Sequence, residues 1–124
     1  MKKFKLIAAA ALALSSAQAK ASDWVDAGTN TSGDHFWYDR SAIIKDKTRA
    51  VTWIRSTSGD GSYFLSRVFF QCDTRMFRIL SMVVYEKGGK NTSVDPNMAF
   101  DSVPPDSMYD RILKEVCPDS MLYM

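Results

Sequence analysis

Three segments in the middle of the chain alternate apolar and polar residues. They span residues 48–57, 63–72 and 76–85. Alternation with a period of two is typical of β-strands that turn one side toward a core. The glycine-containing stretch 58–62 and the three residues 73–75 are the only connections between them. Since parallel neighbours need connections of a dozen or more residues, the three segments are predicted to form an antiparallel meander.

Weaker strand patterns flank this meander on both sides. Trp24 and Val25 begin one that Gly28 is expected to end, and the aromatic run 36–38 forms another. A further short strand is predicted at 91–95, after a glycine turn. Together these segments predict an antiparallel meander sheet of about five to six strands.

The last part of the chain changes to a helical period. Pro104 and Pro105 stop any strand, and Ser107 is a typical N-cap residue with Asp110 three positions later, as in a capping box. Apolar residues then recur at spacings of three and four, at Tyr109, Ile112, Leu113 and Val116. The pattern predicts one C-terminal helix, ended by Pro118, that packs on one face of the sheet in an α+β fold.

The chain has two cysteines, Cys72 and Cys117. In an exported protein an even number of cysteines usually forms disulfides, and here only one pairing exists. Cys72 lies on the same strand face as Phe70, and Cys117 lies one turn after Leu113, so both sulfurs are expected between sheet and helix. A redox-active pair is the less favoured alternative, because the C-x-x-C spacing is absent.

The N-terminal residues have the pattern of an export signal. Three lysines precede the apolar run 6–14, and Ala17-Gln18-Ala19 matches the small-x-small site that signal peptidases cut. We expect a signal peptide at 1–19, with cleavage after residue 21 as the alternative, and a single domain at 20–124. The apolar run is shorter than the roughly 20 residues that span a bilayer, and no cysteine lies near the cleavage site for lipidation. The mature protein is therefore expected in the periplasm, at the cell surface or secreted.

The net charge of the chain argues against binding to nucleic acid or to membranes. The chain has 16 Lys+Arg and 14 Asp+Glu, and loss of Lys2, Lys3 and Lys5 with the signal peptide would leave 13 against 14, a net charge of −1. Such a balance gives no overall field that attracts nucleic acid or an anionic membrane. We expect neither as a partner.

Residues of catalytic type are sparse. His35 is the only histidine; a metal or catalytic role is one hypothesis for it, and a solvated surface side chain is the simpler one. Zinc sites need three or four ligands, and phosphate-loop, G-x-S-x-G and H-E-x-x-H motifs are absent from the sequence. The acidic residues near the N-terminus are scattered, at Asp23, Asp26, Asp34 and Asp39. We therefore expect no enzyme activity, no catalytic residues, no metal and no cofactor.

One face of the predicted sheet is unusually rich in aromatic and arginine residues. If the face with Phe64, Val68, Phe77 and Ile79 packs on the helix, the opposite face carries Trp53, Arg55, Tyr63, Leu65, Arg67, Phe69, Arg78, Leu80 and Met82. Strict alternation through 76–85 puts Val83 and Tyr85 on the helix side. A solvated face should be more polar, and aromatics with arginine are typical of interface centres. Two interpretations stay open: other segments cover this face, or it is an interface for a protein partner or a second copy.

Several of these residues together resemble a known family. They are Trp24, Phe36-Trp37-Tyr38-Asp39, Ile43, Val51-Thr52-Trp53, Phe70-Gln71-Cys72, Tyr85 before a glycine turn, and the helix from Pro105-x-Ser107 to Cys117. This pattern, from about residue 24 to 118, is similar to the surface-adhesin E (protein E) family of Gram-negative bacteria. The resemblance implies a sheet of about six antiparallel strands with a C-terminal helix tethered by the disulfide.

The resemblance also implies a function. It indicates a non-enzymatic, dimer-forming surface protein that adheres to host cells and binds matrix and serum proteins such as vitronectin, laminin and plasminogen. The best-known adhesin of this kind is a lipoprotein, whereas no lipidation cysteine is present here. A small periplasmic inhibitor, or an accessory factor of an envelope complex, is therefore kept as the alternative function.

Overall fold

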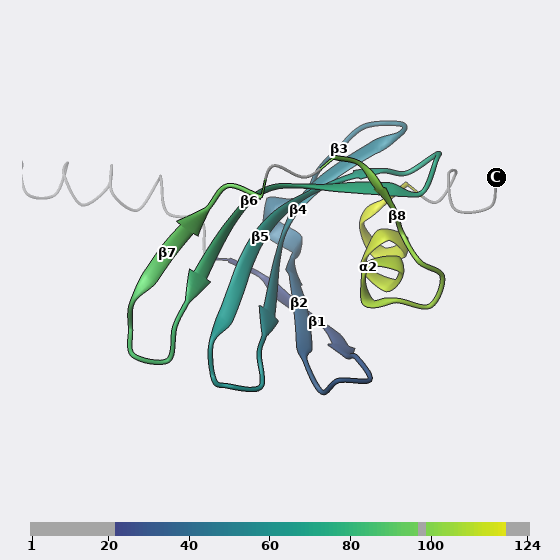
Figure 1. The fold of residues 1–124 in the computed structure, drawn as a ribbon. Helices are drawn as coiled ribbons and strands as arrows, with labels where there is room; N and C mark the ends of the chain where they lie inside the picture. The colour runs from purple at the N-terminus through teal and green to yellow at the C-terminus, as the bar shows by residue number, and fades with distance from the viewer. Residues whose placement is uncertain (1–21, 97–98, 119–124) are drawn as a thin grey trace, which may run out of the picture.

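In the part of the chain that the structure describes, eight β-strands form one curved sheet, and the α-helix α2 (Met108–Val116) lies against one side of it (Figure 1). This computed structural model describes residues 22–96 and 99–118, so the expected signal peptide at 1–19 lies outside the described residues. The elements are β1 (Trp24–Thr29), β2 (His35–Asp39), the 3-10 helix η1 (Arg40–Ala42), β3 (Ile44–Lys45), β4 (Arg49–Thr57), β5 (Tyr63–Gln71), β6 (Met76–Tyr85), β7 (Asn91–Val94), β8 (Asp101–Ser102) and α2 (Met108–Val116).

The predicted meander and the C-terminal helix are confirmed. Strands β1, β2, β4, β5, β6 and β7 follow one another across the sheet, and every pair is antiparallel. The expected number of five to six strands is too low, because β3 pairs with β4 and β8 pairs with β6. These two strands have two residues each, which is too short to show a periodic pattern in the sequence.

The first strand is longer than predicted. Gly28 does not end β1, which continues to Thr29. Instead, the pairing with β2 shifts between Asp26 and Gly28, and Gly28 takes a φ of 110°. Glycine tolerates this conformation without a Cβ clash, so it allows the bulge and lets the strand proceed.

A second bulge, in β6, changes which side chains face the core. Leu80 is an extra residue between two consecutive pairs of the β5–β6 ladder. Beyond it the alternation is shifted by one position. Met82 therefore packs against the core, while Val83 and Tyr85 share the other face with their β5 partners. The sequence prediction for these three residues was wrong because strict alternation assumes an unbroken ladder.

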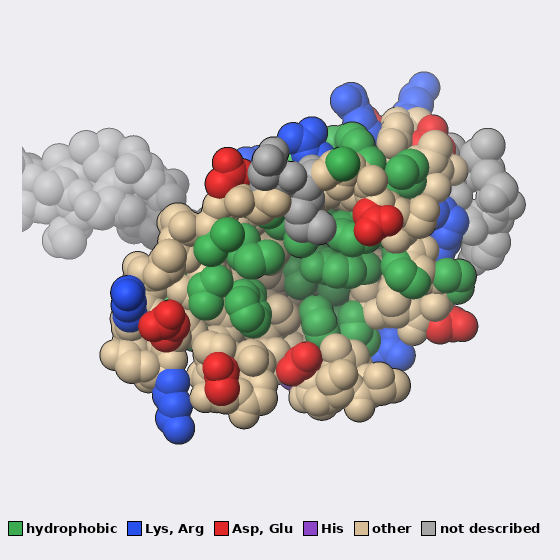
Figure 2. All heavy atoms as spheres, in the orientation of Figure 1, with side chains coloured by type: hydrophobic (Ala, Val, Ile, Leu, Met, Phe, Trp, Pro, Cys, Tyr) green, Lys and Arg blue, Asp and Glu red, His purple; other side chains and the backbone are tan. Residues whose placement is uncertain are grey.

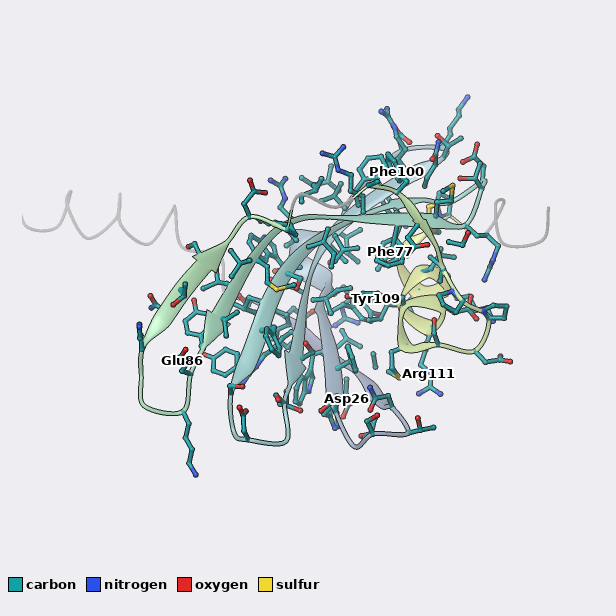
Figure 3. All side chains as sticks on the ribbon, viewed as in Figure 1. Asp26, Phe77, Glu86, Phe100, Tyr109 and Arg111 are labelled. Atoms are coloured by element: carbon teal, nitrogen blue, oxygen red, sulfur yellow. A yellow bond between two sulfur atoms is a disulfide. The ribbon has the colours of Figure 1, made fainter. Side chains whose placement is uncertain are left out.

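The core lies between α2 and the part of the sheet that curves around it. Its buried apolar residues are Ala27, Tyr38, Ala50, Ile54, Val68, Phe70, Cys72, Phe77, Ile79, Val103, Ile112, Leu113, Val116 and Cys117. The Tyr109 ring of α2 stacks on Phe77 of β6, with 4.8 Å between ring centroids (Figure 3). Burying each large aliphatic side chain of the helix contributes about 1.5–3 kcal/mol. This packing, more than intrinsic propensity, holds so short a helix in place.

The predicted disulfide is present and joins the helix to the sheet. Cys72 directly follows β5, Cys117 is the C-cap residue of α2, and their Cα atoms are 5.9 Å apart. At the other end of the helix, Ser107 accepts a hydrogen bond from the Asp110 N–H at 3.1 Å, as its role of N-cap predicts. Both ends of α2 are thus fixed by residues that the sequence identifies.

Candidate functional site

The side of the sheet that faces away from α2 carries seven of the eight residues predicted as a candidate interface. We name this side the open face; on the three central strands it consists of Arg49, Val51, Trp53, Arg55, Thr57, Tyr63, Leu65, Arg67, Phe69, Gln71, Met76, Arg78, Ser81, Val83 and Tyr85. These residues alternate with the buried residues of the core side. The eighth predicted residue, Leu80, is the bulged residue of β6 and is 39% exposed.

Arg55 lies between two aromatic rings at the centre of the open face. Its guanidinium carbon is 5.2 Å from the Trp37 ring centroid and 4.8 Å from that of Tyr63. Tyr63 in turn stacks on Tyr85 of β6, with centroids 4.6 Å apart and planes 6° from parallel. The buried Nε of Arg55 has no hydrogen-bond partner among the described residues. Cation–π contacts hold this side chain in one orientation without neutralising its charge.

His35 extends this stack toward the edge of the sheet. Its ring lies 4.2 Å from the Trp37 ring, its Nε2 is 2.6 Å from Asp26 Oδ1, and its Nδ1 is 3.1 Å from Thr29 Oγ1. The hydrogen bond with His35, and then that from the Gly28 N–H, holds the pKa of Asp26 below its ordinary value. No cluster of ligating residues suited to a metal occurs within residues 22–96 and 99–118. The histidine is placed to orient Trp37.

Two tryptophans line a hollow beside these residues. The hollow has a volume of about 380 Å³, and Trp24, Trp53 and Leu65 form its apolar wall. Asp39 lies at its polar side, where Oδ1 accepts hydrogen bonds from the backbone N–H groups of Asp23 and Ser41. Burial acts to raise the pKa of Asp39, but these hydrogen bonds and that from the Ser41 hydroxyl outweigh it and keep the pKa low. The carboxylate is therefore occupied by the fold itself.

The far end of the open face is apolar and partly covered. Val51 pairs with Phe69 on one side and with Ile44 on the other, and Ile44 is 66% exposed. Phe100 contacts Phe69 edge to face at 5.6 Å and lies across β6 from Phe77 (Figure 3). The segment that contains Phe100 thus covers the open face at Phe69, in agreement with the interpretation that other segments cover this face. Elsewhere the described residues leave Arg67 and Arg78 exposed and the aromatic side chains and Arg55 partly exposed.

Two other surface features compete with the open face as a binding site. Figure 2 shows hydrophobic side chains gathered over β5 to β7, beside α2, where Phe64, Met82, Val84 and Val94 share one side of the ladder. Among the described residues, no ion pair or cation–π contact includes a residue of that patch. The second is a hollow of about 300 Å³ between α2 and β1.

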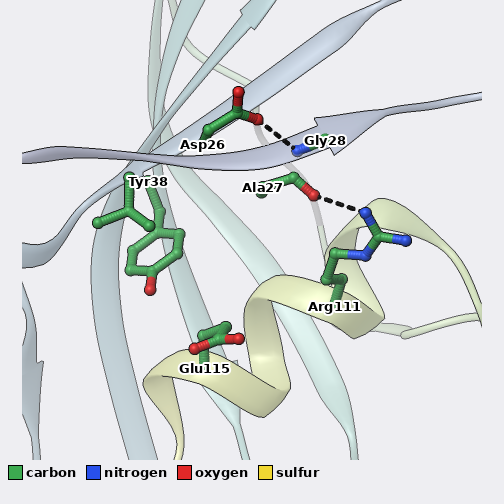
Figure 4. Close-up of a pocket in the computed structure, with 7 residues that line it drawn as sticks. Asp26, Ala27, Gly28, Tyr38, Arg111 and Glu115 are labelled. Atoms are coloured by element: carbon green, nitrogen blue, oxygen red, sulfur yellow. Dashed lines mark hydrogen bonds between the residues drawn. The ribbon is translucent and has the colours of Figure 1, made fainter.

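Figure 4 shows that second hollow, which Tyr38 from β2 and Arg111 and Glu115 from α2 help to line. Arg111 donates a hydrogen bond to the Ala27 carbonyl at 2.9 Å. Burial, and next the charge of Glu115, raise the pKa of Tyr38. Because its arginine holds the helix to β1, this hollow serves the fold and offers little for a ligand.

Sequence reasoning missed several residues of the open face. Trp37 stands directly opposite Arg55 through the β2–β4 pairing, and Trp24, which stands opposite Asp39 in the β1–β2 pairing, lines the same hollow as Trp53. Alternation shows that Trp37 faces the opposite side from Phe36 and Tyr38. Only the pairing of β2 with β4 shows that this side is the open face. Tyr85 was missed because of the β6 bulge.

A comparison with protein families decides what kind of protein this is. The family model described as surface-adhesin protein E matches residues 24–118, which is most of the chain. The chain belongs to this family. Curated proteins and solved structures give no significant match. Membership of the adhesin E family indicates an adhesin-like protein that is exported or at the cell surface and binds other proteins. Among the described residues, no helix is long and apolar enough to cross a membrane.

Proposed function

We propose that this adhesin E family member is an exported, non-enzymatic binding protein that holds its partners on the open face. The partners we expect are host matrix or serum proteins. The observation that carries the proposal is the concentration of partly exposed aromatic side chains and of arginines on the side of the sheet away from α2. Such side chains dominate the binding energy of protein interfaces.

The architecture supports a rigid surface of this kind. The open face lies on three long, hydrogen-bonded strands rather than on loops. The disulfide and the apolar face of α2 fix the opposite side of the same strands. A binding surface that is already ordered loses less conformational entropy when a partner binds.

The location of the protein tests this proposal against its alternative. Intact cells that carry the gene are labelled with antibody or treated with a protease, and an osmotic-shock fraction is prepared in parallel. Labelling and cleavage on intact cells support an adhesin. Recovery of all the protein in the shock fraction, with no labelling, would instead support a periplasmic inhibitor or accessory factor.

A further inference from the structure

We propose that the open face recognises an extended, acidic segment of its protein partner through Arg55, Arg67 and Arg78. This inference rests on the proposed function, because it names the chemistry of the partner that the same face binds. It follows from how the arginines of the chain are used, from their spacing on the sheet, and from the side chains between them.

The seven arginines of the chain fall into two groups. Four of them are engaged by the fold: Arg40 with Asp23, Arg49 with Asp46, Arg75 with Asp110, and Arg111 with the Ala27 carbonyl. Within residues 22–96 and 99–118, no ion pair or side-chain hydrogen bond includes Arg55, Arg67 or Arg78. The three arginines that have neither a carboxylate nor a carbonyl partner among the described residues are thus those that lie among the aromatic residues.

The strand register places these three arginines on one diagonal line. Arg55 stands opposite Leu65, so Arg67 is its diagonal neighbour on β5. Arg78 stands opposite Phe69, so it is the diagonal neighbour of Arg67 on β6. One diagonal step in an antiparallel sheet measures about 7–8 Å. An extended chain places every second side chain on the same side, about 6.6 Å apart. Acidic residues at alternate positions would therefore meet successive arginines.

The surroundings of the arginines favour an anionic protein segment with apolar residues. Trp53, Leu65 and Phe69 lie beside the line and offer contacts to apolar side chains of the partner. The nearby carboxylates do not compete, because Asp26 is bonded to His35 and Asp39 to backbone N–H groups. Guanidinium groups bind carboxylates through paired, charge-assisted hydrogen bonds. Arg55 is already oriented by its two rings, which reduces the entropy lost on binding.

A short labelled peptide tests the inference directly. Binding of a fluorescein-labelled ten-residue peptide of alternating Glu and Thr to the full-length oxidised protein is measured by anisotropy in 50 mM and 300 mM NaCl. The test variant carries Arg67→Gln and Arg78→Gln, since both side chains are exposed and unpaired. The control variant carries Arg40→Gln and Lys114→Gln, which change the net charge equally; Lys114 lies on α2, on the other side of the sheet. The thermal midpoint of each variant verifies folding.

We expect the test variant to bind the peptide about tenfold more weakly than the wild type, and the control to stay within about twofold. Salt should weaken wild-type binding, because accessible ion pairs are screened. Equal losses in both variants, or equal binding of a peptide with five Glu followed by five Thr, would overturn the inference. So would binding of heparin but not of the peptide, which would point to an anionic polysaccharide. A further outcome would also overturn the inference: the protein forms dimers without the peptide, and Arg67→Gln weakens them. The three arginines would then belong to an interface with a second copy of the chain.

The inference and the proposed function can fail separately. If the peptide does not bind, but Leu65→Glu still abolishes binding to a host protein, the acidic partner is wrong and the open face remains the binding surface. If Leu65→Glu leaves host-protein binding unchanged while the peptide binds through Arg67 and Arg78, the arginine line binds acidic segments, but the open face is not the binding surface for host proteins.

Discussion

Asp110 joins the start of α2 to the turn between β5 and β6. Its carboxylate accepts a hydrogen bond from the Asp106 N–H at 3.1 Å and forms ion pairs with Lys114 and Arg75, although its side chain is only 4% exposed. Burial acts to raise the pKa of Asp110, but the hydrogen bonds from Asp106 and Lys114 and the charge of Arg75 outweigh it. The pKa is therefore below its ordinary value.

The first prediction concerns Asp110→Asn. We expect it to lower the free energy of unfolding by about 1–3 kcal/mol at pH 7, because hydrogen bonds to a charged group are lost. Since the folded-state pKa lies below the unfolded value of about 3.9, the stabilisation is complete above that pH range and is lost as the pH falls through the lowered pKa. Urea unfolding at pH 7 and pH 3 should show the gap between wild type and variant closing in acid. Asp73→Asn, at an exposed turn, should leave both values nearly unchanged.

The second prediction concerns Gly28→Ala. A Cβ at this position would overlap an Arg111 guanidinium nitrogen, and the φ of 110° is itself unfavourable for alanine. We expect a loss of about 2–3 kcal/mol, from backbone strain and from the displaced hydrogen bond to the Ala27 carbonyl. Gly33→Ala has a similar φ and no nearby atom, so it measures the strain alone. Equal thermal midpoints for the two variants would show that the Arg111 contact has no energetic role.

At the scale of the elements, the bulge in β6 decides the sides of the last strand residues. Met82 packs on the core and Val83 pairs with Leu65 on the open face. We therefore expect Met82→Asp to destabilise the fold by about 2–3 kcal/mol, and Val83→Asp to cost about 1 kcal/mol or less. Chemical denaturation of both variants shows which substitution lowers the free energy of unfolding more. The opposite order would mean that β6 alternates without the bulge.

The fourth prediction concerns the disulfide between α2 and the sheet. The disulfide closes a loop with a sequence separation of 45, which contributes about 4 kcal/mol by the loop-entropy estimate. Replacing Cys72 and Cys117 together by alanine should lower the melting temperature by roughly 15–30 °C, at about 4–8 °C for each kcal/mol. The single variant Cys117→Ser should lose a similar amount. A melting temperature within a few degrees of the oxidised wild type would show that packing alone holds the helix.

At the scale of the whole molecule, local patterns predicted most of the fold. The alternation of 48–57 and 63–72, with a tight loop between them, identified the strands and placed Trp53, Leu65 and Phe69 on one side. The capping serine and the two cysteines predicted the helix and its attachment. The bulges at Ala27 and Leu80 left no local signal, because they arise from pairing between strands.

The difference between local patterns and pairing between strands also explains which residues of the open face the sequence predicted. Six predicted residues lie together on the open face because β4 and β5 alternate regularly, and the seventh, Arg78, precedes the bulge in β6. Trp37 and Tyr85, which complete the stack around Arg55 and Tyr63, depend on the β2–β4 register and on the β6 bulge. Phe100 reaches Phe69 through a segment with no periodic pattern at all.

The central claim is that the open face binds the partner and the opposite side carries the helix. Its most direct test is the binding of the purified protein to immobilised vitronectin, laminin and plasminogen, measured for the wild type, Leu65→Glu and Val94→Glu. Val94 is a matched control, since it is apolar, 39% exposed and on the other side of the sheet. We predict that the wild type and Val94→Glu bind at least one of these proteins equally, and that Leu65→Glu binds it at least about tenfold more weakly. Retained binding by Leu65→Glu with loss in Val94→Glu would contradict the account.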